Sequence, residues 1–208
     1  MSTLLYVASS PRGAASDSRA LASVFLDAYQ EAHREDRIVT LDLWEEPLPR
    51  FGPEGASAKM SVFGGEELTV EQKQAWEQAR RYADQFASAD KYLFSVPMWN
   101  LSIPYVLKQW IDIVTQPGIT FAFEEARGYV PVLHGKKATA VYTSSVYYPG
   151  APASYSRDFQ SEYLKEWLHV TGVDDMTEIR FQPIYLSPNR DEDRAAALDT
   201  ARDAGKSF

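Results

Sequence analysis

Three serines near the amino terminus are the residues of this chain best placed for chemistry. They lie in a polar loop between an apolar run, Leu4–Ala8, and the start of a helical pattern. The N–H groups that begin a helix have no partner within it, and the helix dipole makes this end positive. Hydroxyls beside such N–H groups form a natural site for an anion. The loop therefore predicts a phosphate site, and its candidate residues are Ser10, Ser16, Asp17 and Ser18.

The same loop also has a purely structural interpretation. Ser16, Asp17 and Ser18 are residue types that cap helices whatever a protein does. The loop has neither the G-x-G-x-x-G nor the G-x-x-x-x-G-K-[ST] pattern. This argues against a dinucleotide held by its pyrophosphate and against hydrolysis of a nucleoside triphosphate. A helix cap and a site for a terminal phosphate monoester both stay open on these residues alone.

The bulk composition restricts the class of protein. A chain of 208 residues, 45% of them hydrophobic, suits a single domain spanning residues 1–208. The net charge of −8 disfavours nucleic acid or an anionic membrane as the main partner. The chain has no cysteine, which excludes thiolate catalysis and disulfides, and its three histidines lack metal-ligand spacing, so no metal site is predicted. Without a signal peptide or a membrane-length apolar run, the expected location is the cytoplasm.

Alternating strand and helix patterns must position the serine loop. The expected strands are Leu4–Ala8, Ile38–Leu43, Lys91–Pro97, Lys137–Thr143 and Thr177–Tyr185. The expected helices run from about Ser18 to His33, from a capping box at Thr69 and Gln72, from near Pro104, from about Ser154 to Val170, and from Ser187 and Pro188. A small hairpin is expected from Ile119–Phe123 and Tyr129–Val132, while Trp44–Leu68 stays unassigned. This alternation predicts an α/β fold with a doubly wound parallel sheet of five strands, in the order 2-1-3-4-5, and helices on both faces.

Three loops meet in such a sheet. Ligands bind beyond the carboxyl ends of the strands where the winding reverses, here between the first and third strands. The serine loop offers anion donors, and the loop after the third strand offers a flat wall and an amide. The loop after the fourth strand offers hydroxyls and backbone groups. The candidate residues of these last two loops are Met98, Trp99, Asn100 and Leu101, and Ser144, Ser145, Val146 and Tyr147. Together the three loops describe a site for a planar aromatic ring with a phosphate tail, which is the shape of flavin mononucleotide (FMN).

The chain resembles the FMN-dependent NADH-azoreductase family of flavodoxin-like quinone reductases over essentially its whole length. The resemblance is carried by the serine loop, by Met98-Trp99-Asn100-Leu101 in place of the family's Met-Tyr-Asn-Phe, and by Gly118-Ile119-Thr120-Phe121. It implies one bound FMN per chain, a homodimer with active sites at the interface, and NADH or NADPH as co-substrate. It also implies two-electron reduction of quinones or azo compounds by a ping-pong cycle. The chain shows no basic cluster suited to a 2′-phosphate, which favours NADH slightly.

One loop departs from the family pattern. The family's fourth-strand loop commonly reads Ser-Arg-Gly-Gly, whereas this chain has Ser144, Ser145, Val146 and Tyr147. Two bulky side chains therefore stand where glycines allow a close approach to the flavin. No residue is predicted to be catalytic, because the cofactor itself would supply the chemistry. The alternative is a flavodoxin-like electron carrier or a flavin-binding protein without its own turnover, and the long Trp44–Leu68 segment favours the enzyme.

Overall fold

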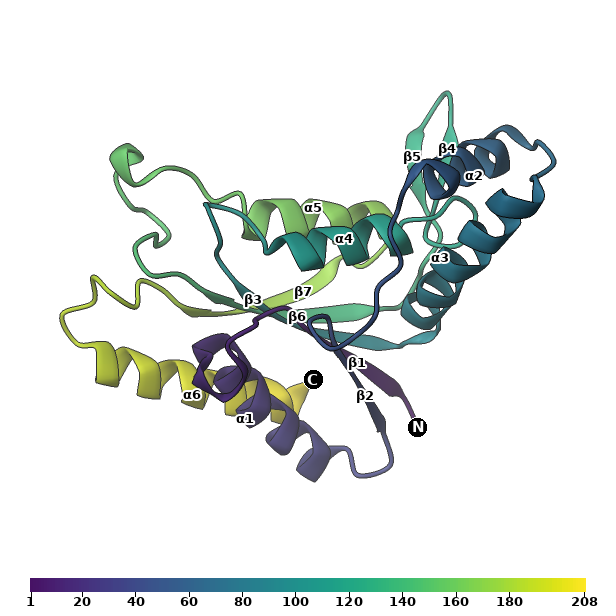
Figure 1. Ribbon diagram of the computed structural model, residues 1–208. Helices are drawn as coiled ribbons and strands as arrows, with labels where there is room; N and C mark the ends of the chain where they lie inside the picture. Colours follow the sequence, from purple (N-terminus) through teal and green to yellow (C-terminus); the bar gives the residue numbers. More distant parts are fainter.

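The computed structural model describes residues 1–208, and a five-stranded parallel sheet forms its centre (Figure 1). The strands of this sheet are β1 (Thr3–Ala8), β2 (Arg37–Asp42), β3 (Lys91–Pro97), β6 (Lys137–Thr143) and β7 (Asp175–Phe181). They pair in the order β2-β1-β3-β6-β7, with every neighbouring pair parallel. Strands β4 and β5 form a separate hairpin, so β6 and β7 are the fourth and fifth strands of this sheet. The predicted order 2-1-3-4-5 is therefore confirmed, and the winding reverses between β1 and β3.

Helices cover both faces of the sheet. One face is covered by α1 (Asp17–Ala32) and α6 (Arg190–Ser207), and the other by α3 (Val70–Ser88), α4 (Tyr105–Val114) and α5 (Ser161–Thr171) (Figure 1). The apolar side chains of the sheet accordingly form two cores, one against each helical layer. The central strands β1 and β3 are buried almost throughout, which explains their nearly continuous apolar sequences.

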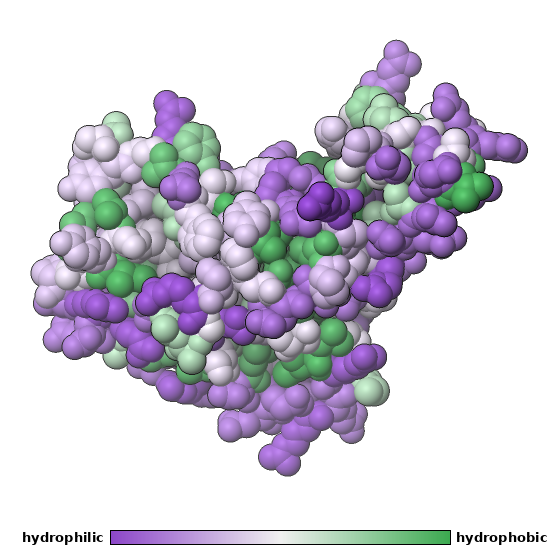
Figure 2. Space-filling view, viewed as in Figure 1, coloured by the Kyte–Doolittle hydropathy of each residue, from purple (hydrophilic) through white to green (hydrophobic).

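A smaller unit stands at one end of the sheet. It consists of α2 (Pro53–Gly64), the upper part of α3, and an antiparallel hairpin of β4 (Phe121–Glu124) and β5 (Gly128–Pro131). Figure 2 shows this end projecting from the body of the molecule, with a hollow beside it. The predicted hairpin is thus confirmed. Helix α2 lies inside the segment left unassigned, because its apolar residues do not form the continuous stripe that marks an amphipathic helix.

Several element boundaries differ from those expected. Helix α5 begins at Ser161 and not near Ser154, because the Asp158 carboxylate accepts hydrogen bonds from the N–H groups of Gln160 and Ser161 and so caps the helix there. A short 3₁₀ turn, η2 (Ala153–Tyr155), precedes it, as η1 (Gly13–Ala15) precedes α1.

The other helix starts are simpler. The capping box of Thr69 and Gln72 at the start of α3 is confirmed, with both reciprocal hydrogen bonds present. The last helix begins at Arg190, two residues later than Pro188, so this proline lies before the helix and not in its first turn. None of the helices combines the length and the apolar character that crossing a membrane requires.

Candidate active site at the carboxyl edge of the sheet

The predicted serine loop forms a cradle at the start of α1. The Ser16 hydroxyl caps the helix by accepting from the N–H of Arg19 at 3.4 Å, and it lies 3.1 Å from the Ser18 hydroxyl. The first N–H groups of the helix, those of Asp17 and Ser18, have no acceptor within the protein. The helix-cap interpretation is confirmed for Ser16, and the two N–H groups without an acceptor leave the predicted phosphate site compatible with this loop.

The side chain of Asp17 turns away from this cradle. Its carboxylate pairs with Arg194 at 3.1 Å and lies 4.0 Å from Arg190, both on α6. The Asp17 side chain therefore joins α1 to α6, and only the Asp17 backbone N–H group is available to donate to an anion. A carboxylate directed into the cradle would repel a phosphate, so this placement suits an anion site.

Arg19 braces the loop from the opposite side. Its guanidinium pairs with Asp42 at the end of β2, at 2.7 Å, and donates to the carbonyl oxygen of Ser10 at 3.3 Å. Ser10 itself is buried, and its hydroxyl accepts weakly from the N–H of Arg12 at 3.5 Å. The charge of Arg19 is thus matched by a neighbouring carboxylate, and the donors of the cradle are hydroxyl and amide groups.

The loop after β3 forms a tight turn with an unusual backbone. Trp99 and Ser102 exchange two backbone hydrogen bonds of 2.8 and 3.0 Å, which close the turn around Asn100 and Leu101. These two residues have φ values of +46° and +75°, a left-handed conformation that asparagine tolerates but that costs free energy in a leucine. Their N–H groups have no partner within the protein. A strained turn that presents two free amide donors is typical of a binding site.

Aromatic side chains stand beside this turn. The ring centroids of Trp44 and Trp99 are 5.8 Å apart, and Tyr105 packs edge-on against Trp44 at 5.4 Å. The Trp44 indole Nε1 also donates to the carbonyl oxygen of Ser9 at 2.9 Å. Sequence analysis missed Trp44, although its position directly after the second strand, at the same edge of the sheet, was an available signal. The predicted flat wall is therefore broader than Met98–Leu101 alone.

The loop after β6 is tied down by its own contacts. The Ser144 hydroxyl donates to the carbonyl oxygen of Tyr147, and the carbonyl oxygens of Ser144 and Ser145 accept from the N–H groups of Ile184 and Tyr185. Burial raises the pKa of the Tyr147 phenol above its ordinary value. The substituted loop is thus a defined turn joined to the chain after β7.

Val146 and Ser145 lie at the exposed tip of the same turn, and Val146 is 42% exposed. The structure brings this loop to the carboxyl edge beside the turn of Met98–Leu101, because Met98 N–H donates to the carbonyl oxygen of Thr143 at 2.7 Å. The three predicted loops therefore lie at one edge of the sheet.

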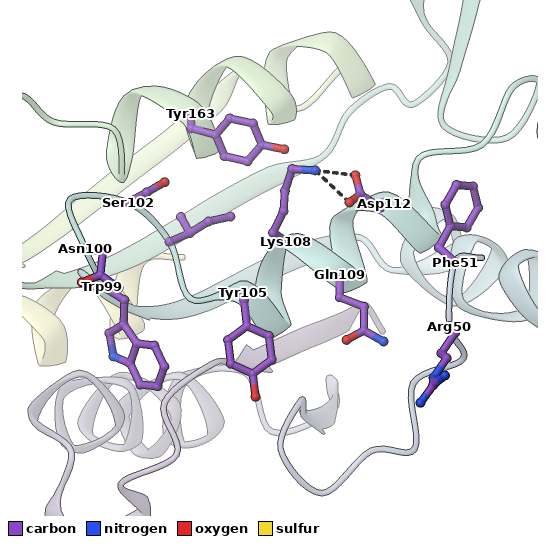
Figure 3. A pocket seen from close by; sticks show the side chains of 11 residues that line it. Arg50, Phe51, Trp99, Asn100, Ser102, Tyr105, Lys108, Gln109, Asp112 and Tyr163 are labelled. Atoms are coloured by element: carbon purple, nitrogen blue, oxygen red, sulfur yellow. Dashed lines mark hydrogen bonds and ion pairs between the residues drawn. The ribbon is translucent and has the colours of Figure 1, made fainter. Parts of the chain in front are cut away.

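A cleft of about 840 Å³ adjoins the strained turn (Figure 3). Trp99 and Asn100 line it on one side, and α4, α5 and the segment around Phe51 line the others. Lys108 and Asp112 form an ion pair of 2.6 Å within it. None of the three serines of the cradle lines this cleft.

A second cavity, of about 580 Å³, continues beyond Tyr163, which lines both spaces. Its lining is mostly aromatic and comes from α2, the hairpin and α5. Lys59 is its only basic lining residue. Burial lowers the pKa of the Lys59 ammonium, which donates to the carbonyl oxygen of Thr115 at 2.6 Å and so caps the carboxyl end of α4.

The residues at the carboxyl edge fit an FMN molecule. A phosphate needs several donors without a carboxylate among them, and the cradle has the hydroxyls of Ser10, Ser16 and Ser18 beside two free N–H groups. A flat ring with carbonyl groups needs amide donors and apolar walls, and the turn of Asn100 and Leu101 has both beside it. The chemistry of this donor set matches that of the predicted cofactor.

Comparison with known proteins agrees with this description. Residues 2–204 match the family described as having a flavodoxin-like fold. The chain is 44% identical over 203 residues to the FMN-dependent NADH:quinone oxidoreductase of Ruegeria pomeroyi, covering 97% of this chain and 100% of the relative. It is 41% identical over 183 residues to the enzyme of the same description from Desulfotalea psychrophila, covering 88% of this chain and 86% of the relative.

Solved structures give the same result. An azoreductase from Bacillus anthracis str. Sterne superposes with a TM-score of 0.91 at 30% identity, and the match covers 100% of both chains. An FMN-dependent NADH-azoreductase from Bacillus anthracis str. Ames Ancestor, solved in complex with FMN, superposes with a TM-score of 0.88 at 25% identity over 100% of this chain and 99% of that one. The chain therefore belongs to the flavodoxin-like family of FMN-dependent NADH:quinone oxidoreductases and azoreductases.

Proposed function

We propose that the protein is an FMN-dependent oxidoreductase that carries two electrons from NADH to a quinone or azo acceptor. The observation that carries this proposal is the set of free N–H donors at the carboxyl ends of β1 and β3, where the sheet reverses its winding. The names of the relatives at 44% and 41% identity support the same activity.

The proposed cofactor residues are those of the three loops. Ser10, Ser16 and Ser18, with the N–H of Asp17, would hold the phosphate. The turn of Met98, Trp99, Asn100 and Leu101 and the loop of Ser144, Ser145, Val146 and Tyr147 would enclose the ring. When bound, FMN supplies two-electron transfer between a nicotinamide and the acceptor. The free amides of the turn would stabilise negative charge on the ring, a role that preformed backbone donors fulfil without reorganisation.

The chain's own residues would then bind and orient two substrates in turn. The cleft beside Trp99 and Tyr105 has an aromatic wall suited to flat substrates, whether nicotinamide or quinone. Because both would use one place, donor and acceptor would alternate in a ping-pong cycle. No side chain has to act as a nucleophile in such a cycle, which agrees with a site made of hydroxyls, amides and aromatic rings.

We also propose a homodimer that completes the active site. Four large apolar side chains around the second cavity are well exposed, namely Met60 at 66%, Phe63 at 48%, Phe123 at 49% and Tyr129 at 62%. Monomeric proteins rarely leave such a cluster in water, and a second copy would cover it. The cytoplasm is the proposed location, in keeping with a nicotinamide-dependent enzyme.

Absorption spectroscopy and kinetics test this function directly. The purified protein is incubated with FMN and desalted, and we expect a yellow protein with one FMN per chain. We expect this holoenzyme to oxidise NADH steadily when a benzoquinone is present, without an added reductase, and to sediment as a dimer. A colourless protein after desalting would contradict the flavin site. A yellow protein that does not turn over NADH would instead identify an electron carrier.

A further inference from the structure

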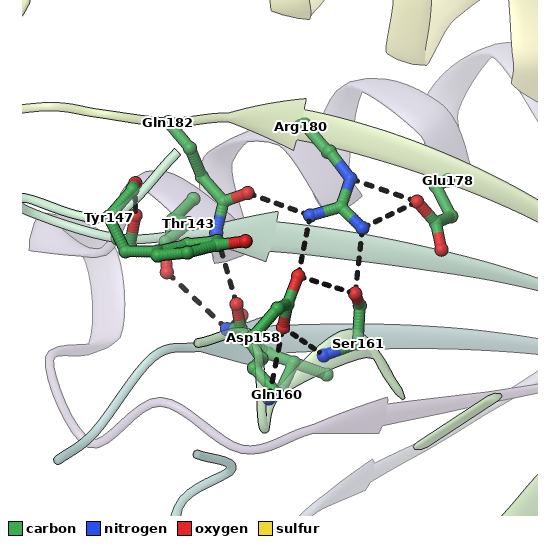
Figure 4. A network of polar contacts seen from close by, with 10 residues as sticks. Thr143, Tyr147, Asp158, Gln160, Ser161, Glu178, Arg180 and Gln182 are labelled. Atoms are coloured by element: carbon green, nitrogen blue, oxygen red, sulfur yellow. Dashed lines mark hydrogen bonds and ion pairs between the residues drawn. The ribbon is translucent and has the colours of Figure 1, made fainter. Parts of the chain in front are cut away.

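A buried polar network lies directly behind the proposed flavin loops (Figure 4). The Gln160 side-chain amide, fully buried, donates to the carbonyl oxygens of Val96 at 2.7 Å and Thr143 at 3.4 Å. Val96 is the next-to-last residue of β3 and Thr143 is the last residue of β6, so both carbonyls lie just before the chain enters the two loops. The Thr143 carbonyl also accepts from the N–H of Met98. Gln160 thus joins the starting points of both loops.

The same segment also holds the far end of the strained turn. Phe159 forms a parallel backbone bridge with Ser102, and the Ser102 hydroxyl donates to the Phe159 carbonyl oxygen at 3.1 Å. Ser102 closes the turn by its two hydrogen bonds to Trp99. Phe159 therefore contacts the turn on its carboxyl side through Ser102, while its neighbour Gln160 contacts the end of β3 that leads into the turn.

Strand β7 fixes the position of this segment. The Gln160 side-chain oxygen accepts from Gln182 at 3.0 Å, and the Gln182 oxygen accepts from Arg180 at 2.9 Å. Arg180 also contacts the Asp158 carboxylate at 3.3 Å and the Ser161 hydroxyl at 2.8 Å. Its position is further held by Glu178 at 2.6 Å. A backbone conformation that costs free energy, such as two consecutive positive φ values, persists only where several surrounding contacts hold it in place.

We propose that Gln160, held in place by Arg180 and Asp158, is a positioning residue that keeps the Asn100–Leu101 turn in its strained conformation and so sets its free amides for the flavin. This inference rests on the flavin site proposed above. The network reaches the cofactor only through the turn and through the starting points of the two loops. Loss of Gln160 should therefore relax the turn without removing any direct contact of the serine cradle.

Hydrogen exchange of the apoprotein tests the first half of this proposal without any flavin. In Gln160→Leu, we expect the hydrogen-bonded amides of Met98, Trp99 and Ser102 to exchange at least tenfold faster than in the wild type, while the amides of the central strands keep their protection. Unchanged exchange in this segment would overturn the inference, even if the protein bound FMN normally. This readout separates failure of the inference from failure of the proposed function.

Flavin titration tests the second half. We expect the Kd for FMN of Gln160→Leu to rise about tenfold, and that of Ser102→Ala, a milder change at an exposed hydroxyl, to rise two- to fivefold. Lys91→Met is the matched control, because Lys91 ties the opposite end of β3 to Tyr29 and Phe208 through its ammonium. It should lower the Tm comparably while leaving the Kd for FMN unchanged. Equal loss of FMN affinity in Lys91→Met and Gln160→Leu would overturn the proposal, because it would reduce the role of Gln160 to general stability.

Discussion

The indole N–H of Trp44 donates to the carbonyl oxygen of Ser9 at 2.9 Å and thereby ties the end of β2 to the start of the serine loop. Trp44 also packs against Trp99, whose centroid lies 5.8 Å away, in the strained turn after β3. One side chain therefore spans the loops that follow β1, β2 and β3. A single residue outside every sequence motif therefore connects the loop of the proposed phosphate cradle with the turn of the proposed ring site.

The first prediction concerns this indole. Trp44→Phe keeps an aromatic ring but loses the hydrogen bond to Ser9, and a lost hydrogen bond of this kind costs about 1 kcal/mol. We expect FMN to bind roughly three- to tenfold more weakly, as measured by quenching of flavin fluorescence. Trp76→Phe on α3, outside the site, is the control and should bind FMN as the wild type does. Equal affinity in Trp44→Phe and the wild type would show that the contact does not matter for the cofactor.

The second prediction concerns the phosphate cradle. Replacing Ser16 and Ser18 together with alanine should weaken FMN binding by about 1–3 kcal/mol, because phosphate oxygens would lose charge-assisted hydrogen bonds. Since Ser16 also caps α1, the double variant should lose some stability as well. Thr69→Ala removes the equivalent cap from α3 and is the matched control for that loss. If the double variant bound FMN as tightly as Thr69→Ala, the phosphate would have to lie elsewhere.

The third prediction concerns the loop that departs from the family pattern. Val146→Gly combined with Tyr147→Gly restores a small-residue loop beside the proposed ring site, and the tip residue Val146 is 42% exposed. We expect the preference among quinones of different size to change more than the Kd for FMN, because the side chains narrow the approach of the substrate. The ratio of kcat/KM values across a quinone series measures this. An unchanged ratio would reject a role for these side chains in acceptor choice.

The fourth prediction concerns pH and stability at the opposite end of the sheet. The N–H of Ser2 and the hydroxyl of Tyr29, each at 2.6 Å, lower the pKa of Asp36 from 3.8 to about 2, with a further contribution from Lys91. Because the folded-state pKa lies below the unfolded one, Asp36 stabilises the fold above pH 4, and this contribution is lost as the pH falls towards 2.

Asp36→Asn tests this linkage. We expect it to lower the free energy of unfolding by on the order of 1–2 kcal/mol at pH 7, where the carboxylate is charged in both states. The difference between variant and wild type should shrink as the pH falls from 4 to 2. Urea unfolding at a series of pH values measures both quantities. A difference that stayed constant between pH 7 and pH 2 would contradict a carboxylate-based contribution.

Much of this protein follows from local patterns of residues. Apolar runs predicted β1 and β3, because a strand buried on both faces needs apolar side chains throughout. The alternation of strands and helices then predicted the sheet order, since parallel crossovers allow few topologies. The order in turn indicated which loops meet, and residue types alone pointed to the serine loop and to Met98–Leu101.

The tertiary structure decided what each side chain at the site does. Asp17 is a residue type that commonly caps helices, yet its side chain pairs with Arg194, 177 residues away along the chain. Trp44 and Ser9 are 35 residues apart, and Gln160 and Val96 are 64 apart, so no periodicity could connect them. The start of α5 depended likewise on Asp158, whose own place depends on Arg180 of β7. The sequence by itself determined the fold and the candidate loops, because hydrophobic periodicity is a local property. Only the packed structure determined how these loops are held, because such contacts depend on which distant residues the sheet brings together.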